Sequence, residues 1–112
     1  MAGERMRRVN EAVRQVLADA LAGELADPRL GFVTVTDVKT SPDLRAARVY
    51  VSVLGDEDAR ASSLTALRSA HGVLQSRIAT QLELKRTPRL EFLYDGTTDR
   101  ALRVESLLRD ER

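Results

Sequence analysis

The fold is decided by residues 32–54, FVTVTDVKTSPDLRAARVYVSVL, a stretch in which apolar and polar residues alternate. Alternation with period two is typical of a β-strand with one buried side, here the side of Val33 and Val35. The valines and alanine at every second position of Ala47–Val53 predict a second strand of the same kind. Thr40–Leu44 lies between them and contains the turn residues serine, proline and aspartate. The stretch therefore predicts a β-hairpin with one apolar face.

The segment before the hairpin predicts a long helix, over residues 5–25. Its apolar residues recur at steps of three and four, which places them on one helical face. Asp27-Pro28 ends the helix, because the residue before a proline avoids helical torsions. The apolar stripe consists of Val9, Val13, Val16, Leu17, Ala20, Leu21 and Leu25.

A second helical segment follows the hairpin and begins near Gly55-Asp56-Glu57-Asp58, where carboxylates would face the positive end of the helix dipole. A glycine inside a helix costs about 1 kcal/mol relative to alanine. We therefore expect a break at Ala70-His71-Gly72, with Gly72 itself at the break and in a positive-φ conformation. The apolar stripe of this segment consists of Leu64, Leu67, Leu74, Ile78 and Leu82.

A third strand is predicted at Leu90–Tyr94, after the helix-ending residues Lys85-Arg86-Thr87-Pro88. The order α-β-β-α-kink-α-β predicts an α+β fold with a three-stranded sheet and helices on one face, as in a KH-like domain of the type II related kind. The Gly-x-x-Gly loop of RNA-binding KH domains is missing. We expect residues 5–95 to form this single domain, and residues 96–112 to form either a C-terminal tail, partly disordered, or a short helix.

The composition of the chain excludes several kinds of site and favours others. The 112 residues fit one domain, and the absence of cysteine excludes disulfides and thiolate metal sites. The N-terminal residues lead into the amphipathic helix without a signal-peptide pattern, so we expect a cytoplasmic protein with no membrane contact. We find no metal-ligand spacing, cofactor motif or catalytic constellation, and expect no metal, no cofactor and no enzyme activity, although the sequence does not exclude a small hydrolase.

Clustered cations are the main functional candidates, because basic and acidic residues nearly balance at 18 and 17 and only clustering would attract nucleic acid. The alternative is a solvated helix face with intrahelical pairs such as Arg7 with Glu11. Arg48 and Tyr50 lie on the opposite sheet face, where they could contact a base, but the pattern favours ordinary contacts with neighbouring strands. The RNA-binding candidates are Arg5, Arg7, Arg8, Arg14, Ser69, His71, Arg77, Lys85, Arg86 and Arg89, with Ala70 and Gly72 as the structural kink.

His71 is the only histidine, and on a continuous helix it would lie on the side of Leu67 and Leu74. A packed or kink-stabilising role is therefore favoured over RNA contact. Three kinds of function remain open on the residues alone. They are a general KH-like RNA-binding module, a protein-interaction domain with a neutral surface, and the small hydrolase mentioned above.

Several strings, in order along the chain, resemble the bacterial ribosome-binding factor A family. The resemblance runs from the first helix to the last strand, and Thr97–Arg103 follows the family only loosely. The family's Ala-x-Gly kink, which replaces the Gly-x-x-Gly loop, is matched by Ala70-His71-Gly72. The matching strings are Arg8-Val9-Asn10-Glu11, Asp27-Pro28-Arg29-Leu30-Gly31, Val33–Val38, Ser41-Pro42-Asp43-Leu44, Tyr50–Gly55 and Pro88–Phe92.

The resemblance implies binding to free or immature small ribosomal subunits near the decoding region, with ribosomal RNA as the ligand. It further implies a role in ribosomal RNA maturation and folding, notably in the cold, and release with help from an assembly GTPase. We expect the chain to act as a monomer.

Overall fold

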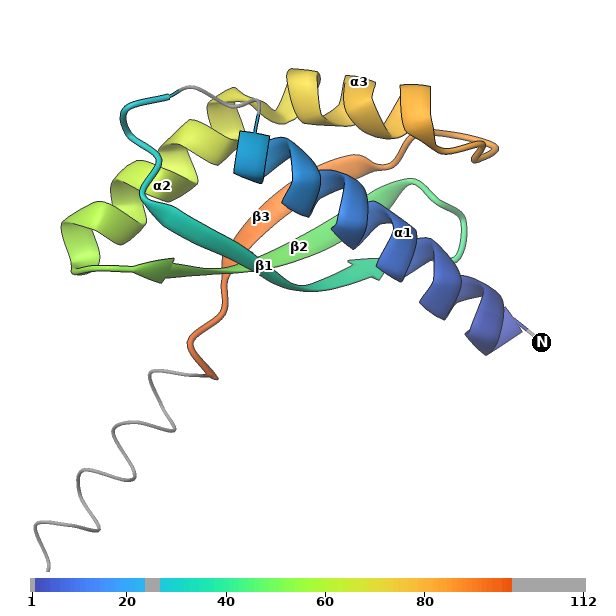
Figure 1. Cartoon of the computed structure of the whole chain (residues 1–112). Coiled ribbons are helices and arrows are strands. Elements are labelled where there is room, and N and C mark those ends of the chain that lie inside the picture. The colour runs from blue at the N-terminus through green and yellow to red at the C-terminus, as the bar shows by residue number, and fades with distance from the viewer. Residues whose placement is uncertain (1, 24–26, 98–112) are drawn as a thin grey trace, which may run out of the picture.

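The computed structural model describes residues 2–23 and 27–97. The elements follow the predicted order, and the two helices after the hairpin are separated by one residue. The prediction for residues 96–112 falls outside the described residues from position 98 onward. The elements are α1 (Ala2–Gly23), β1 (Phe32–Thr40), β2 (Ala46–Leu54), α2 (Glu57–Ser69), α3 (His71–Gln81) and β3 (Arg89–Tyr94) (Figure 1).

The sheet has the order β1-β2-β3, with β1 and β2 antiparallel and β2 and β3 parallel. A parallel pair needs a crossover connection, which α2 and α3 provide together. All three helices lie on one face of the sheet, as Figure 1 shows. The predicted α+β fold with helices on one face is therefore confirmed.

A β-bulge interrupts the alternation that we predicted for β1. Val35 pairs with Val51, and Tyr50, which precedes Val51 in β2, pairs with Asp37. Thr36 is therefore the extra residue of the bulge. The bulge shifts the inward side by one position, and Val38 faces the core where strict alternation would have placed Asp37. Thr36 donates a hydrogen bond of 2.7 Å from Oγ1 to Oδ2 of Asp95, just after β3.

The core lies between the helices and the inner face of the sheet. Val51 is fully buried at 0% exposure, as the assignment of the strand faces predicted. Burial of apolar side chains from every helix and strand is the main favourable term holding these elements together. The core cluster contains Val13, Val16, Leu17, Ala20, Val35, Val38, Ala47, Val49, Val51, Leu67, Leu74, Ile78, Leu90 and Phe92.

The acids before α2 begin the helix, as predicted. Asp56 is the N-cap, and its Oδ1 accepts a hydrogen bond of 2.9 Å from the backbone N–H of Ala59. The preceding Gly55 has a φ of 134°, a conformation that other residues rarely adopt. An added Cβ at Gly55 would lie only 2.8 Å from the Cβ of Ala59. The turn into α2 therefore requires glycine.

The helix break lies at Ala70, which is both the C-cap of α2 and the N-cap of α3, with φ −90° and ψ 5°. The predicted break is confirmed, but the expectation for Gly72 was wrong. Gly72 is the second residue of α3 and does not have a positive φ. The bridge conformation at Ala70 is sterically open to ordinary residues, so the break does not need a glycine.

Candidate nucleic-acid interface

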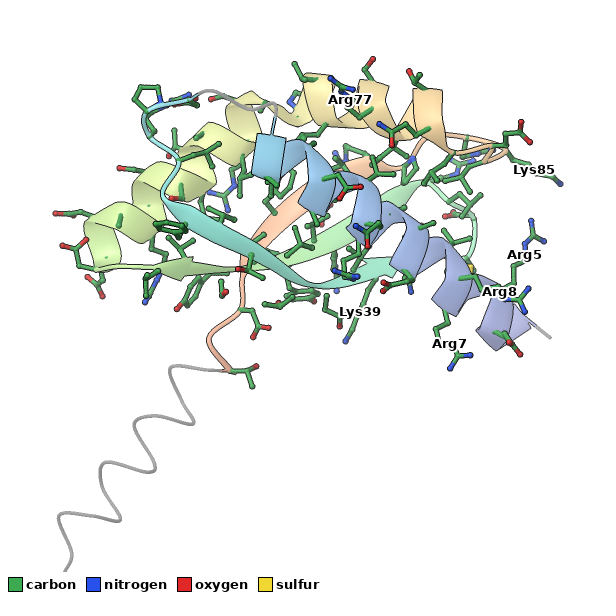
Figure 2. All side chains as sticks on the ribbon, in the orientation of Figure 1. Arg5, Arg7, Arg8, Lys39, Arg77 and Lys85 are labelled. Carbon is green, nitrogen blue, oxygen red and sulfur yellow. The ribbon has the colours of Figure 1, made fainter. Side chains whose placement is uncertain are left out.

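The first feature of the surface is a half-open hollow of about 910 Å³, which we call the N-terminal hollow. It lies where the start of α1 meets the β1–β2 loop and the α3–β3 loop. Figure 2 shows Arg5 and Lys85 at this end of the molecule. The lining residues are Arg5, Met6, Val9, Pro42, Asp43, Leu44, Lys85 and Arg86.

The lining carries three cations and one carboxylate. Within the described residues, the side chains of Arg5 and Lys85 form no hydrogen bond or ion pair, so both charges face solvent without an ion-pair partner. Asp43 is held in the loop, where its Oδ1 accepts hydrogen bonds from the Ser41 hydroxyl at 2.7 Å and the Arg45 N–H at 3.1 Å. The bond from Ser41 is the largest cause that lowers the pKa of Asp43, with smaller contributions from the charges of Arg45 and Arg86. Asp43 therefore stays ionised at neutral pH.

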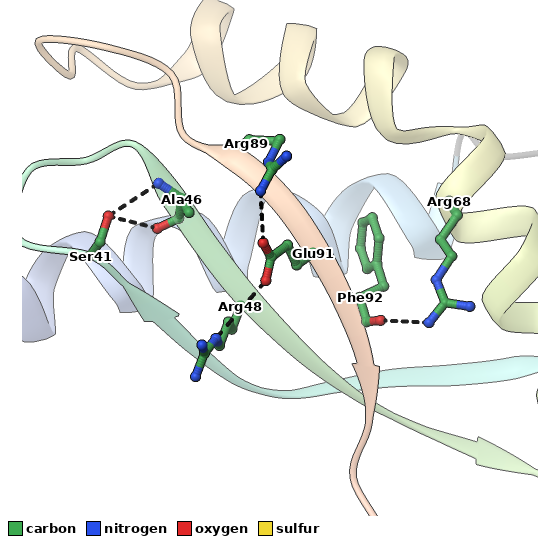
Figure 3. Close-up of polar contacts among 7 residues, drawn as sticks. All are labelled: Ser41, Ala46, Arg48, Arg68, Arg89, Glu91 and Phe92. Carbon is green, nitrogen blue, oxygen red and sulfur yellow. Dashed lines mark hydrogen bonds and ion pairs between the residues drawn. The ribbon is translucent and has the colours of Figure 1, made fainter.

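The apolar floor of the hollow includes Leu44, which has an unusual backbone conformation. Leu44 has a φ of 61°, in the left-handed region that non-glycine residues occupy at a cost of about 1–2 kcal/mol. The conformation turns its side chain inward, where it is 8% exposed. The loop holds it there, since the Leu44 N–H bonds to Ser41 O at 2.9 Å and the Ala46 N–H to Ser41 Oγ at 3.1 Å (Figure 3).

A second group of cations lies further along α1 and lines a smaller hollow of about 390 Å³ with Asp37 and Val38 of β1. These cations have acidic neighbours on the same helix. Glu4 lies 3.6 Å from Arg7 and 3.4 Å from Arg8. Arg14 bonds Glu11 with 2.9 Å between Nε and Oε2, and this bond is the main cause that lowers the pKa of Glu11. Intrahelical pairing therefore exists, but Arg7 pairs with Glu4 and not with Glu11.

A third group surrounds the break between α2 and α3, where His71 and Arg89 line a hollow of about 460 Å³ with Arg68 and Glu91. The Arg68 guanidinium donates a 3.1 Å hydrogen bond to the carbonyl of Phe92 in β3 (Figure 3). His71 is exposed rather than packed, and its Nδ1 lies 3.1 Å from the carbonyl oxygen of Arg68. Because a carbonyl only accepts, Nδ1 carries the hydrogen in that contact, which ties α3 to the last turn of α2.

Two of the predicted site residues line none of these three hollows. Ser69 is the exposed last residue of α2, and Arg77 is a half-buried residue of α3 (Figure 2). The structure therefore brings Arg5, Lys85 and Arg86 together, and separately Arg7, Arg8 and Arg14.

The open face of the sheet carries the residues considered as an alternative. The Lys39 ammonium lies 5.7 Å from the centre of the Tyr50 ring. Glu91 of β3 lies 3.9 Å from the Arg48 guanidinium and 3.0 Å from that of Arg89 (Figure 3). Contacts between neighbouring strands thus occupy Arg48 and Tyr50, in agreement with the cross-strand interpretation.

Sequence reasoning missed the apolar floor of the N-terminal hollow and the role of Arg68. Val9 was assigned to the core stripe and Met6 to no particular surface, and nothing local shows that both face the hairpin loop. The string Ser41-Pro42-Asp43 predicted a turn but gave no signal for a left-handed leucine after it. Arg68 directly follows the buried Leu67 in the helix. That position predicts only an exposed side chain and gives no sign of the hydrogen bond to Phe92.

Two features are absent from the described ranges, 2–23 and 27–97. No helix there is long and apolar enough to cross a membrane. No group of three or more histidine, cysteine, aspartate or glutamate side chains there is placed to hold a metal ion. Fold and surface together define a small α+β domain, compatible with the KH-like type, with cations gathered around half-open hollows.

Comparison with known proteins places this domain. A family model described as "Ribosome-binding factor A" matches residues 5–108. A protein of that name from Heliobacterium modesticaldum is 46% identical over 108 residues, covering 96% of this chain and 89% of that protein. The chain belongs to the ribosome-binding factor A family.

Solved structures agree with this assignment. The crystal structure of ribosome-binding factor A from Thermus thermophilus has a TM-score of 0.71 at 32% identity, covering 80% of this chain and 94% of that one. A homology model of Thermus thermophilus ribosome binding factor A, as fitted into the cryo-EM map of a 30S complex, has a TM-score of 0.63 at 34% identity, covering 79% of this chain and 92% of that one.

Proposed function

We propose that this chain is an assembly factor that binds free or immature small ribosomal subunits and assists the maturation and folding of their RNA. The observation that carries the proposal is the set of cations around the N-terminal hollow, where Arg5 and Lys85 have no partner in the described part of the chain. Groups of uncompensated cations bind phosphates by releasing counterions. A homology model of the Thermus thermophilus relative, fitted into the cryo-EM map of a 30S complex, supports the choice of ligand.

The proposed RNA-binding residues are those predicted from the sequence, and we rank them by the charges around them. Arg5, Lys85 and Arg86 come first, because one carboxylate faces three cations. The cations of α1 come second, since Glu4 and Glu11 offset part of their charge. Ser69, His71, Arg77 and Arg89 complete the proposed set.

Further parts of the proposal follow the family. Residues 5–95 act as one domain, the chain works in the cytoplasm as a monomer, and it has no catalytic activity of its own. An assembly GTPase helps to release it from the subunit. In cells that lack the protein, small-subunit RNA precursors with unprocessed ends are expected to accumulate, most strongly in the cold.

The test is cosedimentation with free small subunits across a range of salt concentrations. Replacing Arg5 and Lys85 by glutamine is expected to lower affinity and to reduce the salt slope by roughly one unit for each phosphate that is no longer neutralised. The matched control replaces Lys39 and Arg48, two exposed cations of the open sheet face, and is expected to bind like wild type. A greater loss in the control would move the RNA site to the open sheet face. Failure of the wild-type protein to cosediment would overturn the proposed function.

A further inference from the structure

We propose that the N-terminal hollow accepts one unpaired RNA base that carries an exocyclic amino group, while Arg5, Lys85 and Arg86 hold the phosphates beside it. The inference rests on the proposed function and adds to it a place for a single nucleotide.

The hollow is large enough to admit a base, and its lining suits one. Its volume of about 910 Å³ lies within the range of ordinary small-molecule sites, roughly 300–1,000 Å³. Met6, Val9 and Leu44 supply an apolar floor, and proteins hold unstacked bases against apolar or aromatic side chains. Bases inside a duplex are stacked and do not reach such a floor, so the ligand is an unpaired nucleotide of a loop, bulge or end.

The charges around the rim fit a nucleotide better than an acidic peptide. Arg5 and Lys85 approach from two separate segments, so phosphates on either side of one base can each meet a cation. Asp43 lies on the same rim and would repel the carboxylates of a peptide. Toward a base it acts as an acceptor for an exocyclic amino group, as aspartate does toward cytosine N4.

The loop geometry keeps that acceptor available. The hydrogen bonds from Ser41 and from the Arg45 N–H both end on Oδ1 of Asp43, while the exposed Arg45 guanidinium forms an ion pair with Oδ2, with Nε 3.5 Å away. A carboxylate has about four lone-pair sites in all, so Oδ2 keeps a site for an amino group beside this ion pair. Adenine, cytosine and guanine carry the amino group, whereas uracil does not. The hollow should therefore prefer cytosine over uracil, two bases of similar size.

The experiment measures binding of the full chain to single-stranded RNA oligonucleotides of about eight residues. Oligocytidine, oligouridine and an abasic strand of the same length have the same phosphates, so differences among them report the base. The expected order is cytidine, uridine, abasic, with about fivefold or more between cytidine and abasic strands, the lower end of the range for base stacking.

Met6→Trp adds a bulky indole to the apolar lining of the hollow, where the base is proposed to lie, without changing the charge of the rim. The variant is expected to bind oligocytidine no more tightly than the abasic strand, with the salt slope unchanged. Thr65→Trp adds the same side chain at an exposed position of α2 outside the hollow and should keep the wild-type preference.

A second variant keeps the test decisive if Met6→Trp does not fold. Replacing both Arg5 and Lys85 by glutamine should weaken binding of all three strands and lower the salt slope, while the ratio between cytidine and abasic strands persists. Loss of that ratio, with the slope unchanged, would overturn the assigned roles.

Other outcomes would also overturn the inference. They are equal affinity of wild type for cytidine and abasic strands, and a preference that survives in Met6→Trp. Tighter, Met6-dependent binding of an acidic peptide of alternating glutamate and leucine would make the hollow a protein-docking site instead.

If Met6→Trp cosediments with free small subunits at wild-type affinity, the hollow is not used there and the proposed function stands. If wild type does not cosediment, the proposed function fails, whereas the oligonucleotide ratios still decide the hollow.

Discussion

Gly55 and Gly72 are a matched pair for substitution by alanine, because only Gly55 has a positive φ. No atom lies within 4 Å of an added Cβ at Gly72. Gly72→Ala should raise the free energy of unfolding by about 0.4–1 kcal/mol, through lower entropy of the unfolded chain. Gly55→Ala should lower it by about 1–3 kcal/mol, through backbone strain and the close approach to Ala59. Urea unfolding of both variants measures the two signs, and loss of stability in Gly72→Ala would contradict the conformation described for α3.

Val51 and Arg7 test which side of each element faces the core. Val51 is fully buried between the sheet and the helices, whereas Arg7 is an exposed residue of α1. Val51→Ala should cost about 1–3 kcal/mol of unfolding free energy, since it removes buried methyl groups and leaves a cavity. Arg7→Ala should stay within about 0.5 kcal/mol of wild type. Equal shifts of the urea midpoint in the two variants would contradict the assigned faces.

At the scale of elements, the stability contributed by the Asp27–Arg29 contact, between α1 and β1, should decrease in acid. The Arg29 guanidinium, and then its backbone N–H, bond Asp27 and lower the pKa of that carboxyl from 3.8 to about 2. Because the folded-state pKa is depressed, this contribution to stability is complete above about pH 4 and is lost as the pH falls through about 2. Asp27→Asn keeps an acceptor but removes the charge.

The measurement for Asp27 is the urea midpoint of wild type and Asp27→Asn at several pH values. Wild type should be more stable at neutral pH, and the difference between the two proteins should shrink between about pH 4 and pH 2. A difference that stays constant over that range would show that the charge of Asp27 does not stabilise the loop.

The elements themselves could be predicted from the sequence, because burial imposes a period on every helix and strand. What the period could not show is where it is locally interrupted. Thr36 is accommodated as a bulge through pairing with β2, and the only local sign is that Val35 and Val38 are three residues apart. We placed Gly72 at the break because glycine weakens a helix. The bridge conformation found at Ala70 is open to ordinary residues, so no residue type in the sequence marks it.

The candidate site was predictable only in part for a similar reason. Clustered cations are visible in the sequence, but their partners are not. Glu4 and Glu11 offset the charges along α1, while Arg5 and Lys85, 80 positions apart, share one hollow. Such neighbours arise from the packing of α1 beside two loops, and no local pattern encodes that contact.

At the scale of the whole molecule, the core cluster is drawn from residues 13–92, and we propose that it folds as one unit without residues 98–112. A chain ending at Thr97 should then unfold in a single transition, with the same urea midpoint as the full chain. Far-UV circular dichroism and Tyr fluorescence should follow coincident curves. A lower midpoint, or two separate transitions, would contradict the proposed domain.

The single residue between α2 and α3 has an electrostatic consequence. A helix carries about half a negative charge at its C-terminal end and half a positive charge at its N-terminal end. At Ala70 the C-terminal end of α2 meets the N-terminal end of α3, so the negative and positive partial charges partly cancel at one residue. The start of α3 therefore attracts an anion less than an isolated helix N-terminus does. A phosphate near the break has to be held by a guanidinium group such as that of Arg89, and binding there should weaken when this side chain is removed.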